Sequence, residues 1–257
     1  MITYVHAIPA LQDNYIWAIV QPPYCLIVDP SEAQPVQDFL AAEQLTLCGI
    51  LITHHHYDHT GGLPVLTGTC DVPVWGPATE SIPQVTCPVS GGDTVHIPEL
   101  QTHYDILALP GHTLGHIGYY DGSRLFCGDT LFAAGMGKIF EGTPEQMLCS
   151  IQCIEALPAD TWIYPAHEYT IDNLHFAKRV EPLNQAINDR IEAITTLRQH
   201  GHPSLPTTLA QEYATNPFLR YREKTVQQAV CEALSSSSTG ELATFTGLRH
   251  WKNHSPS

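Results

Sequence analysis

The chain has 257 residues, of which 43% are hydrophobic, and this is enough apolar material for one large domain or for a main domain with a smaller partner. The formal net charge is −15, because 26 Asp and Glu residues outnumber 11 Lys and Arg residues. Nucleic-acid binding depends on clustered cations, so this balance argues against a nucleic acid as the partner.

The sequence also argues against a membrane protein or an exported protein. No apolar run approaches the ~18 residues of a membrane-spanning helix, and the first six residues lack the basic and then apolar pattern of a signal peptide. The eight cysteines include no Cys-x-x-Cys pair, so we expect reduced thiols and not a disulfide framework. We therefore expect a cytoplasmic protein without a membrane partner, and no obligate protein partner is evident.

Short apolar runs predict strands in the first two thirds of the chain. They are Ile16–Val20, Cys25–Val28, Ile50–Thr53, Val72–Trp75, Tyr104–Leu109, Ile117–Tyr120, Arg124–Cys127 and Trp162–Tyr164. The two runs that flank Asp121-Gly122 predict a β-hairpin, because this residue pair is typical of a tight turn. Helical patterns at residues 35–44 and 144–157 both open with Pro, which the first turn tolerates. Strands mixed with helices indicate an α/β fold in which helices cover sheets.

Beyond Tyr169 the strand signal stops and a helical pattern replaces it. The apolar positions that recur at helical spacing are Ile187, Ile191, Ile194 and Leu197. Gly201 then follows as a helix cap, and residues 222–234 predict another helix. We therefore divide the chain into a first domain of residues 1–170 and a helical domain of residues 171–257.

A dense group of metal-binding side chains, His54, His56, Asp58 and His59, follows the apolar run at residues 49–53. Imidazole nitrogens and carboxylate oxygens are ligands of borderline divalent metals. The run predicts a buried strand that delivers the group to a strand end, where functional sites of α/β sheets gather. A solvated histidine-rich loop is the alternative interpretation.

Three further fragments disfavour that alternative, because His112, Asp129 and His167 each lie where an apolar run ends. Together with the first group they make seven candidate ligands, whereas one zinc ion needs about three or four. Seven ligands suit two divalent metal ions if one carboxylate bridges them, and hydrolases use such pairs with the ions about 3.5–4 Å apart.

The motif His54-x-His56-x-Asp58-His59, followed by the three isolated ligands, resembles the dinuclear hydrolases of the metallo-β-lactamase superfamily. The resemblance implies an αββα sandwich with a C-terminal helical domain. It also implies a first ligand group of His54, His56 and His112, a second ligand group of Asp58, His59 and His167, and Asp129 as the bridge. Asp29 and His116 would orient ligands from behind. Zinc is the expected metal, with iron and manganese as alternatives for this all-N/O set.

A narrower resemblance covers nearly the whole chain and is to the glyoxalase II, or hydroxyacylglutathione hydrolase, family. The fragments that carry it are Asp13–Trp17, Thr53–Gly62, Pro110–His116, Cys127–Phe132, Ala166–Thr170, Asn216–Arg220 and Arg249-x-x-Lys252. It implies cleavage of S-(2-hydroxyacyl)glutathione, above all S-D-lactoylglutathione, to glutathione and D-lactate, the second step of methylglyoxal detoxification. Asp58 and Asp129 would be the catalytic residues, acting with a hydroxide that bridges the metals.

The same resemblance implies that the substrate is held by Lys138, Phe140, Tyr169, Arg249 and Lys252. Local cations can hold an anionic substrate on an acidic protein, because fields fade over a Debye length of about 8 Å. Phe140 stands where some relatives have Tyr, so one hydroxyl contact is expected to be missing. Asn253 replaces an Asp that is often seen after the lysine, which we expect to loosen the terminal contacts.

Other functions compete with this hypothesis. An acyl-homoserine lactonase or another dinuclear hydrolase of the same fold would share most of the ligands, and a catalytically silent metal-binding protein could share all of them. A persulfide dioxygenase uses one iron, which Asp58 together with His59 argues against. The helical tail argues against the lactonase and the dioxygenase, and the absence of Gly-x-Ser-x-Gly disfavours a serine hydrolase.

Overall fold

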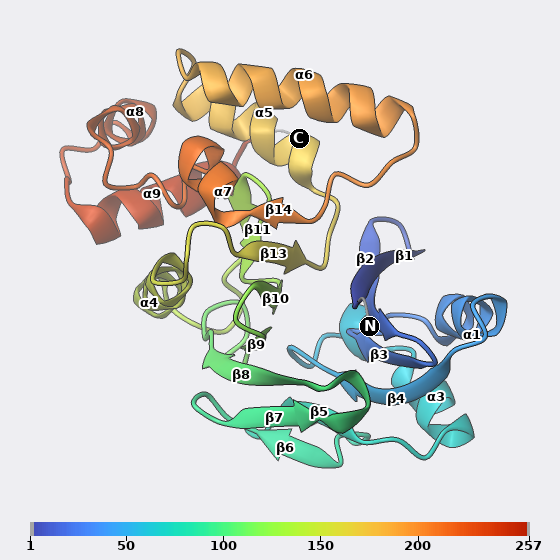
Figure 1. Ribbon diagram of the computed structural model, residues 1–257. Coiled ribbons are helices and arrows are strands. Elements are labelled where there is room, and N and C mark those ends of the chain that lie inside the picture. Colours follow the sequence, from blue (N-terminus) through green and yellow to red (C-terminus); the bar gives the residue numbers. More distant parts are fainter. Residues whose placement is uncertain (1–2, 256–257) are drawn as a thin grey trace.

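The computed structural model describes residues 3–255 and shows two large sheets that face each other, with helices on their outer sides (Figure 1). Residues 1, 2, 256 and 257 lie outside the described part. The expectation that no signal peptide is present therefore concerns a stretch whose first two residues are not described. No helix within residues 3–255 combines the length and the apolar character needed to cross a membrane.

The first sheet joins an antiparallel half to a parallel half. Its strands, in spatial order, are β1 (Tyr4–Ala10), β2 (Asn14–Gln21), β3 (Tyr24–Val28), β4 (Thr46–Leu51), β5 (Val74–Pro77) and β6 (Cys87–Val89). Strands β1 to β3 pair antiparallel, and β3 to β6 pair parallel. Every residue of β2 is buried, as expected for a strand covered on both faces.

The second sheet contains the predicted hairpin around Asp121-Gly122. Its strands, in spatial order, are β14 (Thr207–Thr208), β13 (Trp162–Pro165), β10 (Arg124–Gly128), β9 (Ile117–Tyr120), β8 (Thr102–Ala108) and β7 (Thr94–Ile97). In the hairpin, Tyr120 lies opposite Leu125 and Tyr119 opposite Phe126. A separate small hairpin follows β10 and consists of β11 (Leu131–Phe132) and β12 (Gly135–Met136).

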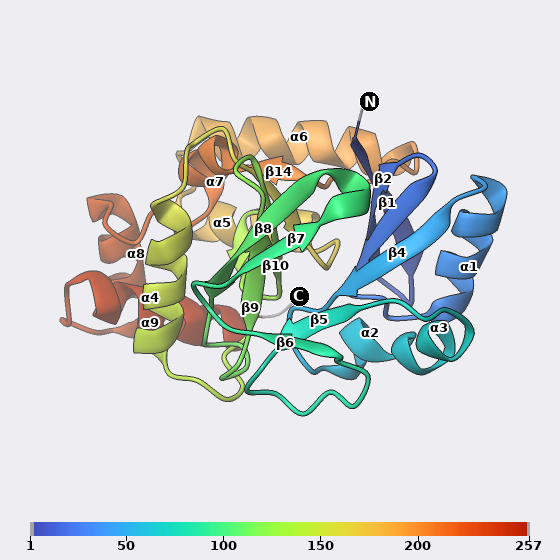
Figure 2. The same cartoon turned by 60° about the horizontal axis from the view of Figure 1, so that its bottom comes forward.

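Helices are found both between the strands and after them. They are α1 (Ala33–Ala42), α2 (Tyr57–Thr60), α3 (Leu63–Thr69), α4 (Pro144–Glu155), α5 (Thr170–Val180), α6 (Gln185–Gln199), α7 (Leu209–Thr215), α8 (Lys224–Leu234) and α9 (Glu241–Asn253), with a 3-10 turn at Pro98–Leu100. Figure 2 shows α1 and α3 outside the first sheet and α4, α8 and α9 outside the second.

The alternation of side chains along each strand builds three apolar layers. On β2, Ile16 packs outward with Val36 of α1, whereas Trp17 packs inward between the sheets. On β10, Phe126 joins that inner layer, and its neighbour Leu125 packs outward with residues of α4 and the C-terminal helices. The predicted α/β sandwich with a helical C-terminal region is confirmed.

Of two expectations about the C-terminal part, one is confirmed and one is wrong. The helix around Ile187–Leu197 ends as predicted, because Gly201 has a φ of +75° just after the C-cap of α6. The expectation that no strand follows Tyr169 is wrong, since β14 pairs antiparallel with β13 and completes the second sheet. A strand of two residues is too short to show a period in sequence. The domain division at residue 170 stays a prediction.

Candidate metal centre and active site

The candidate ligands come from strand ends at one edge of the two sheets. His54 and His56 follow β4, Asp129 follows β10, and His167 follows β13. Gly128, which precedes Asp129, has a φ of +49°, and a Cβ there would lie 2.8 Å from Nε2 of His116. Only glycine therefore fits this turn without strain. His112 lies in the loop after β8, and Asp58 and His59 lie on the short helix α2.

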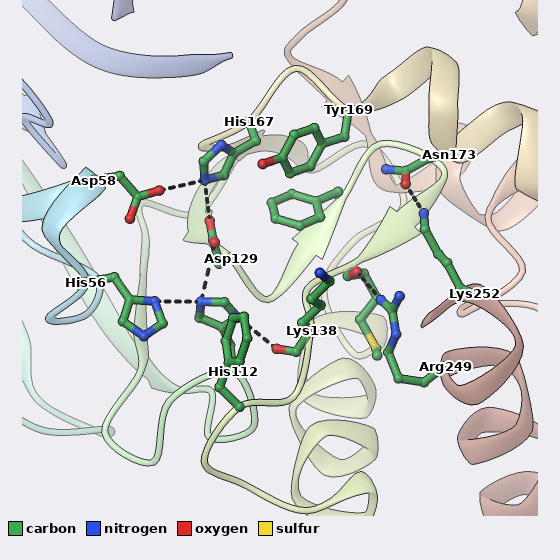
Figure 3. A pocket seen from close by; sticks show the side chains of 13 residues that line it. His56, Asp58, His112, Asp129, Lys138, His167, Tyr169, Asn173, Arg249 and Lys252 are labelled. Atoms are coloured by element: carbon green, nitrogen blue, oxygen red, sulfur yellow. Dashed lines mark hydrogen bonds and ion pairs between the residues drawn. The ribbon is translucent and has the colours of Figure 1, made fainter. Parts of the chain in front are cut away.

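The first ligand group brings three ring nitrogens together. Nδ1 of His56 lies 3.1 Å from Nε2 of His54. It also lies 3.0 Å from Nε2 of His112 (Figure 3). Nδ1 of His112 lies 2.8 Å from the carbonyl oxygen of Lys138, which can only accept, so Nε2 of His112 carries a lone pair. Burial lowers the pKa of all three imidazoles, so they are neutral. Ligands about 2.0–2.1 Å from a tetrahedral zinc ion are themselves about 3.3–3.4 Å apart, so this arrangement fits a metal ion.

The second ligand group meets Asp129 beside the first. Nε2 of His167 lies 3.4 Å from Oδ2 of Asp58 and 3.3 Å from Oδ1 of Asp129. Nε2 of His59 lies 3.4 Å from the same Oδ1 atom and 3.8 Å from Oδ2 of Asp58. The other oxygen of Asp129, Oδ2, lies 3.4 Å from Nε2 of His112. Asp129 therefore faces both ligand groups, as a bridging carboxylate must.

Two buried atoms in this group have no hydrogen-bond partner within the described residues, Nε2 of His59 and Oδ1 of Asp129. Buried polar atoms normally have partners, and a divalent cation would satisfy both at once. Burial alone would lower the pKa of His59 and His167, but the carboxylate of Asp129 raises them to about 10 and about 11. The two imidazoles thus hold protons in the place of a metal.

Asp29 and His116 lie behind the ligands, but they act differently. Oδ2 of Asp29 lies 2.9 Å from Nδ1 of His59, and the same carboxylate accepts hydrogen bonds from the backbone and the hydroxyl of Thr53. His116 instead accepts a hydrogen bond from the backbone N–H of Asp129 at 3.2 Å, and its ring stacks on His54. Asp29 orients a ligand side chain, whereas His116 holds the turn that carries the bridge.

His55 belongs to neither ligand group, although its ring lies beside that of His56, with the centroids 5.0 Å apart. Its ring lies between two carboxylates, with Nδ1 at 3.0 Å from Glu80 and Nε2 at 3.4 Å from Glu141. Glu80 also accepts hydrogen bonds from Thr113 and from the backbone N–H of Gly115. These contacts fix the loop that carries His112.

A cavity of about 680 Å³ extends from the ligands to the C-terminal helix α9 (Figure 3). Its lining residues are His56, Asp58, His112, Asp129, Phe132, Met136, Lys138, Phe140, His167, Tyr169, Asn173, Arg249 and Lys252. All five residues with a predicted substrate role line it, together with ligands from both groups. The structure thus joins in one cavity residues that lie almost 200 positions apart in the sequence.

Comparisons with known proteins agree along nearly the whole chain. Residues 12–167 match the family model "Metallo-beta-lactamase superfamily", and residues 168–255 match "Hydroxyacylglutathione hydrolase C-terminus". A hydroxyacylglutathione hydrolase of Vibrio parahaemolyticus is 48% identical over 97% of this chain and 98% of its own length. One of Nitrosomonas europaea is 44% identical over 97% of this chain and 95% of its own length.

The chain belongs to the hydroxyacylglutathione hydrolase family. This confirms the resemblance that the sequence motifs indicated. Solved structures of other proteins show the same fold as this chain. ETHE1 from Myxococcus xanthus has a TM-score of 0.66 at 22% identity and covers 98% of both chains. The B3 metallo-beta-lactamase BLEG-1 has a TM-score of 0.64 at 22% identity and covers 84% of this chain and 99% of its own.

The end of the cavity away from the ligands contains two cations that face neutral oxygens. Arg249 is 6% exposed, and its Nη1 donates to the carbonyl of Met136 at 2.9 Å, whereas its buried Nε has no partner within the described residues. Nζ of Lys252 contacts Oδ1 of Asn173. Burial lowers the pKa of Arg249 to about 10 and that of Lys252 to about 7. Such cations are suited to an anion that enters the cavity.

Sequence reasoning missed several residues of this site. Asn173 and Met136 line the cavity but belong to no motif. Asp13, whose Oδ1 lies 2.8 Å from Nδ1 of His167, was part of a fragment that marked the family but received no role. The hydrogen bond joins residues 154 positions apart, so no local pattern could have revealed it.

Proposed function

We propose that this member of the family hydrolyses S-(2-hydroxyacyl)glutathione thioesters, with S-D-lactoylglutathione as the main substrate and glutathione and D-lactate as products. That reaction is the second step of methylglyoxal detoxification. The observation that carries the proposal is the single cavity that joins the two ligand groups to the buried Arg249 and the half-buried Lys252. The names of the relatives, at 44% and 48% identity over nearly the full length, support the same substrate.

We further propose that the two ligand groups hold two divalent cations, zinc first and iron or manganese as alternatives. When bound, such a pair supplies Lewis acidity toward the thioester carbonyl and a nucleophilic water at neutral pH. The orphaned atoms of His59 and Asp129 support this assignment. One solved relative, TTHA1623, was crystallised "in a di-iron-bound form", which concerns that protein and leaves the metal of this one to be measured.

The other residues of the cavity position the substrate. Arg249, Lys252 and Lys138 would bind the carboxylates of the glutathione part, since charge-assisted hydrogen bonds are the strong ones. Tyr169 stacks on His167, with ring centroids 4.8 Å apart, and lines the same cavity as the three basic residues. Phe140, which is 63% exposed, contacts the rings of His56 and His112 edge-on and offers an apolar wall.

Asp58 and Asp129 are the carboxylates nearest to the reacting bond in this proposal. The side chain of Asp58 is 38% exposed, so it reaches the cavity, whereas that of Asp129 is 10% exposed. Neighbouring imidazoles hold the pKa of both carboxyls well below the usual range, so both are anionic at neutral pH. They would bind cations and direct the nucleophile toward the carbonyl carbon.

The alternatives are not favoured. A lactonase of the same fold does not account for the match of residues 168–255 to the C-terminus of hydroxyacylglutathione hydrolases. A silent metal-binding protein does not account for Arg249 and Lys252, two basic side chains that line the same cavity as the ligands. We place the enzyme in the cytoplasm, and the free thiols of its eight cysteines suit a reducing compartment.

The deciding experiment compares three substrates with one metal-replete preparation. S-D-lactoylglutathione, a small acyl thioester without the tripeptide and an acyl-homoserine lactone should be assayed side by side, with metal content measured on the same sample. We expect fast turnover of the first substrate alone. Preference for the lactone, or equal turnover of both thioesters, would contradict the proposal.

A further inference from the structure

We propose that Asp13 and Asn14 are positioning residues that fix the second ligand group and thereby set its affinity for a metal ion. The inference rests on the ligand set proposed above but not on the proposed substrate. Asp13 ends the turn that leads into β2, and Asn14 is the first residue of that strand; neither was given a role by the sequence motifs.

Asp13 determines which nitrogen of His167 is available. Its carboxylate only accepts hydrogen bonds, and its Oδ1 lies 2.8 Å from Nδ1 of His167, so the proton of the neutral ring is on Nδ1. When the protonated ring gives up its second proton on metal binding, the lone pair is therefore on Nε2, which faces Asp58 and Asp129. A carboxylate behind a ligating histidine fixes the ring and raises its basicity.

The second ligand group is thus supported by two carboxylates, Asp13 on His167 and Asp29 on His59 at 2.9 Å. The first ligand group has weaker partners. His112 is held by a backbone carbonyl, and His54 lies 3.0 Å from the hydroxyl of Thr53. The two groups therefore differ in how strongly their imidazoles are polarised.

Asn14 supports the third member of the second group. Its Nδ2 donates to the backbone carbonyl of Asp58 at 3.1 Å and to Oδ2 of Asp58 at 3.4 Å. Asn14 is 6% exposed, whereas the side chain of Asp58 is 38% exposed. The buried amide restrains a carboxylate that would otherwise be free to turn into the cavity.

The backbone keeps both residues in place. Asn14 forms an isolated antiparallel bridge with His167, flanked by hydrogen bonds from Tyr15 N to Ala166 O at 2.7 Å and from Glu168 N to Asp13 O at 2.8 Å. The hydroxyl of Tyr15 also donates to Glu168 at 3.0 Å. The start of β2 in the first sheet is thus fastened to the end of β13 in the second, where His167 lies.

The test is a titration of metal-free protein with Zn²⁺ against a competing chelator. In the parent we expect two binding events. Asp13→Ala should weaken one event by about 10–100-fold and leave the other unchanged, which is the usual effect of losing such a partner. His56→Ala should weaken the other event. Asp13→Asn, which keeps an acceptor oxygen, should have an affinity between those of the parent and Asp13→Ala.

The matched control is Asp172→Ala. Asp172 is exposed on α5 and lines, together with Asp13, a second cavity next to the one that contains the ligands. It belongs to neither ligand group, so the affinity of both binding events should equal that of the parent. The side chain of Asp13 is 33% exposed, so its truncation leaves no cavity in the core, and the melting temperature of the metal-free variant is measured to detect a general loss of structure.

Two outcomes would overturn the inference. One is a parent that binds two Zn²⁺ ions and an Asp13→Ala variant that binds both equally well. The other is an Asp13→Ala variant in which both events weaken together and the metal-free protein melts earlier, because that pattern indicates general loss of structure. A parent that binds fewer than two ions would refute the ligand set itself, whatever its activity.

Discussion

Oδ2 of Asp129 lies 3.4 Å from Nε2 of His112, although the other oxygen of this carboxylate faces the second ligand group. The two groups are therefore coupled through one side chain. Asp129→Asn keeps the shape but removes the charge, so we expect less than two metals per chain and a fall in kcat by orders of magnitude. Elemental analysis and kinetics on the same sample test this. Two retained metals with near-parent turnover would show that the bridge is elsewhere.

Metal binding should become tighter as the pH rises. In the metal-free protein the pKa of His59 is about 10 and that of His167 about 11, so both rings are protonated at neutral pH. These protons must leave when a metal binds, and fewer remain as the pH approaches the raised values. We expect proton release on Zn²⁺ binding and a stronger apparent affinity at pH 8 than at pH 6. Calorimetry in buffers with different ionisation enthalpies measures the release, and binding without proton release would refute this account.

Loss of Arg249 and Lys252 should separate substrate binding from metal binding. The variant with Arg249→Ala and Lys252→Ala should raise KM for the glutathione thioester, since each charge-assisted contact contributes about 1.5–3 kcal/mol, or about tenfold to a hundredfold in affinity. Metal content and turnover of a small thioester should not change. Lys178→Ala, at an exposed lysine on α5, is the control. An equal loss with both substrates would indicate a structural role for α9.

The affinity for the glutathione thioester should fall as the pH rises through about 7. Burial lowers the pKa of Lys252 to about 7, so its ammonium is charged below this pH and neutral above it. The substrate carboxylates stay ionised over the whole range. In the pH profile of kcat/KM, which reports on the free enzyme, the parent should show this decline and Lys252→Arg should lack it. A decline of the same size in the arginine variant would assign it to another group.

Phe140→Tyr should improve binding of the glutathione thioester. The ring of Phe140 is 63% exposed at the cavity, so an added hydroxyl needs no space inside the core. One new hydrogen bond contributes about 0.5–1.5 kcal/mol, which corresponds to about a two- to tenfold lower KM. The small thioester serves as the internal comparison. Equal improvement with both substrates would place the contact on the acyl part and not on the tripeptide.

The sequence was most informative where metal-binding side chains directly follow an apolar run that predicts a strand. His54, His56, Asp58 and His59 form one local motif, and the structure brings His112, Asp129 and His167 to the same point. Long-range partners gave no local signal, so Asp13 and Asn14 were not recognised as supports of His167 and Asp58. Asp13 precedes a strand of the first sheet, whereas its partner His167 follows a strand of the second.

Irregular elements were also missed, for physical reasons. Strand β1 alternates between exposed and partly buried residues over Tyr4–Ala7, so its apolar run is broken. Helix α9 contains Gly247, which weakens a helical pattern in sequence, yet a Cβ there would collide with Val230 of α8. The close packing of α8 and α9 requires glycine at position 247, although glycine has a low helix propensity.

The pairing of β14 with β13 bears on how substrate preference can change within the family. Thr207 and Thr208 form the edge strand of the second sheet, so the C-terminal segment, which also carries Arg249 and Lys252, is hydrogen-bonded to the sheet whose strand ends carry Asp129 and His167. Phe218 and Leu248 pack in the same apolar cluster as Leu125 and Ile163. Exchange of the C-terminal segment between relatives would therefore also replace the residues that the C-terminal helices contribute to this apolar cluster. New specificities are reached more readily by point changes along the cavity than by recombination at residue 170.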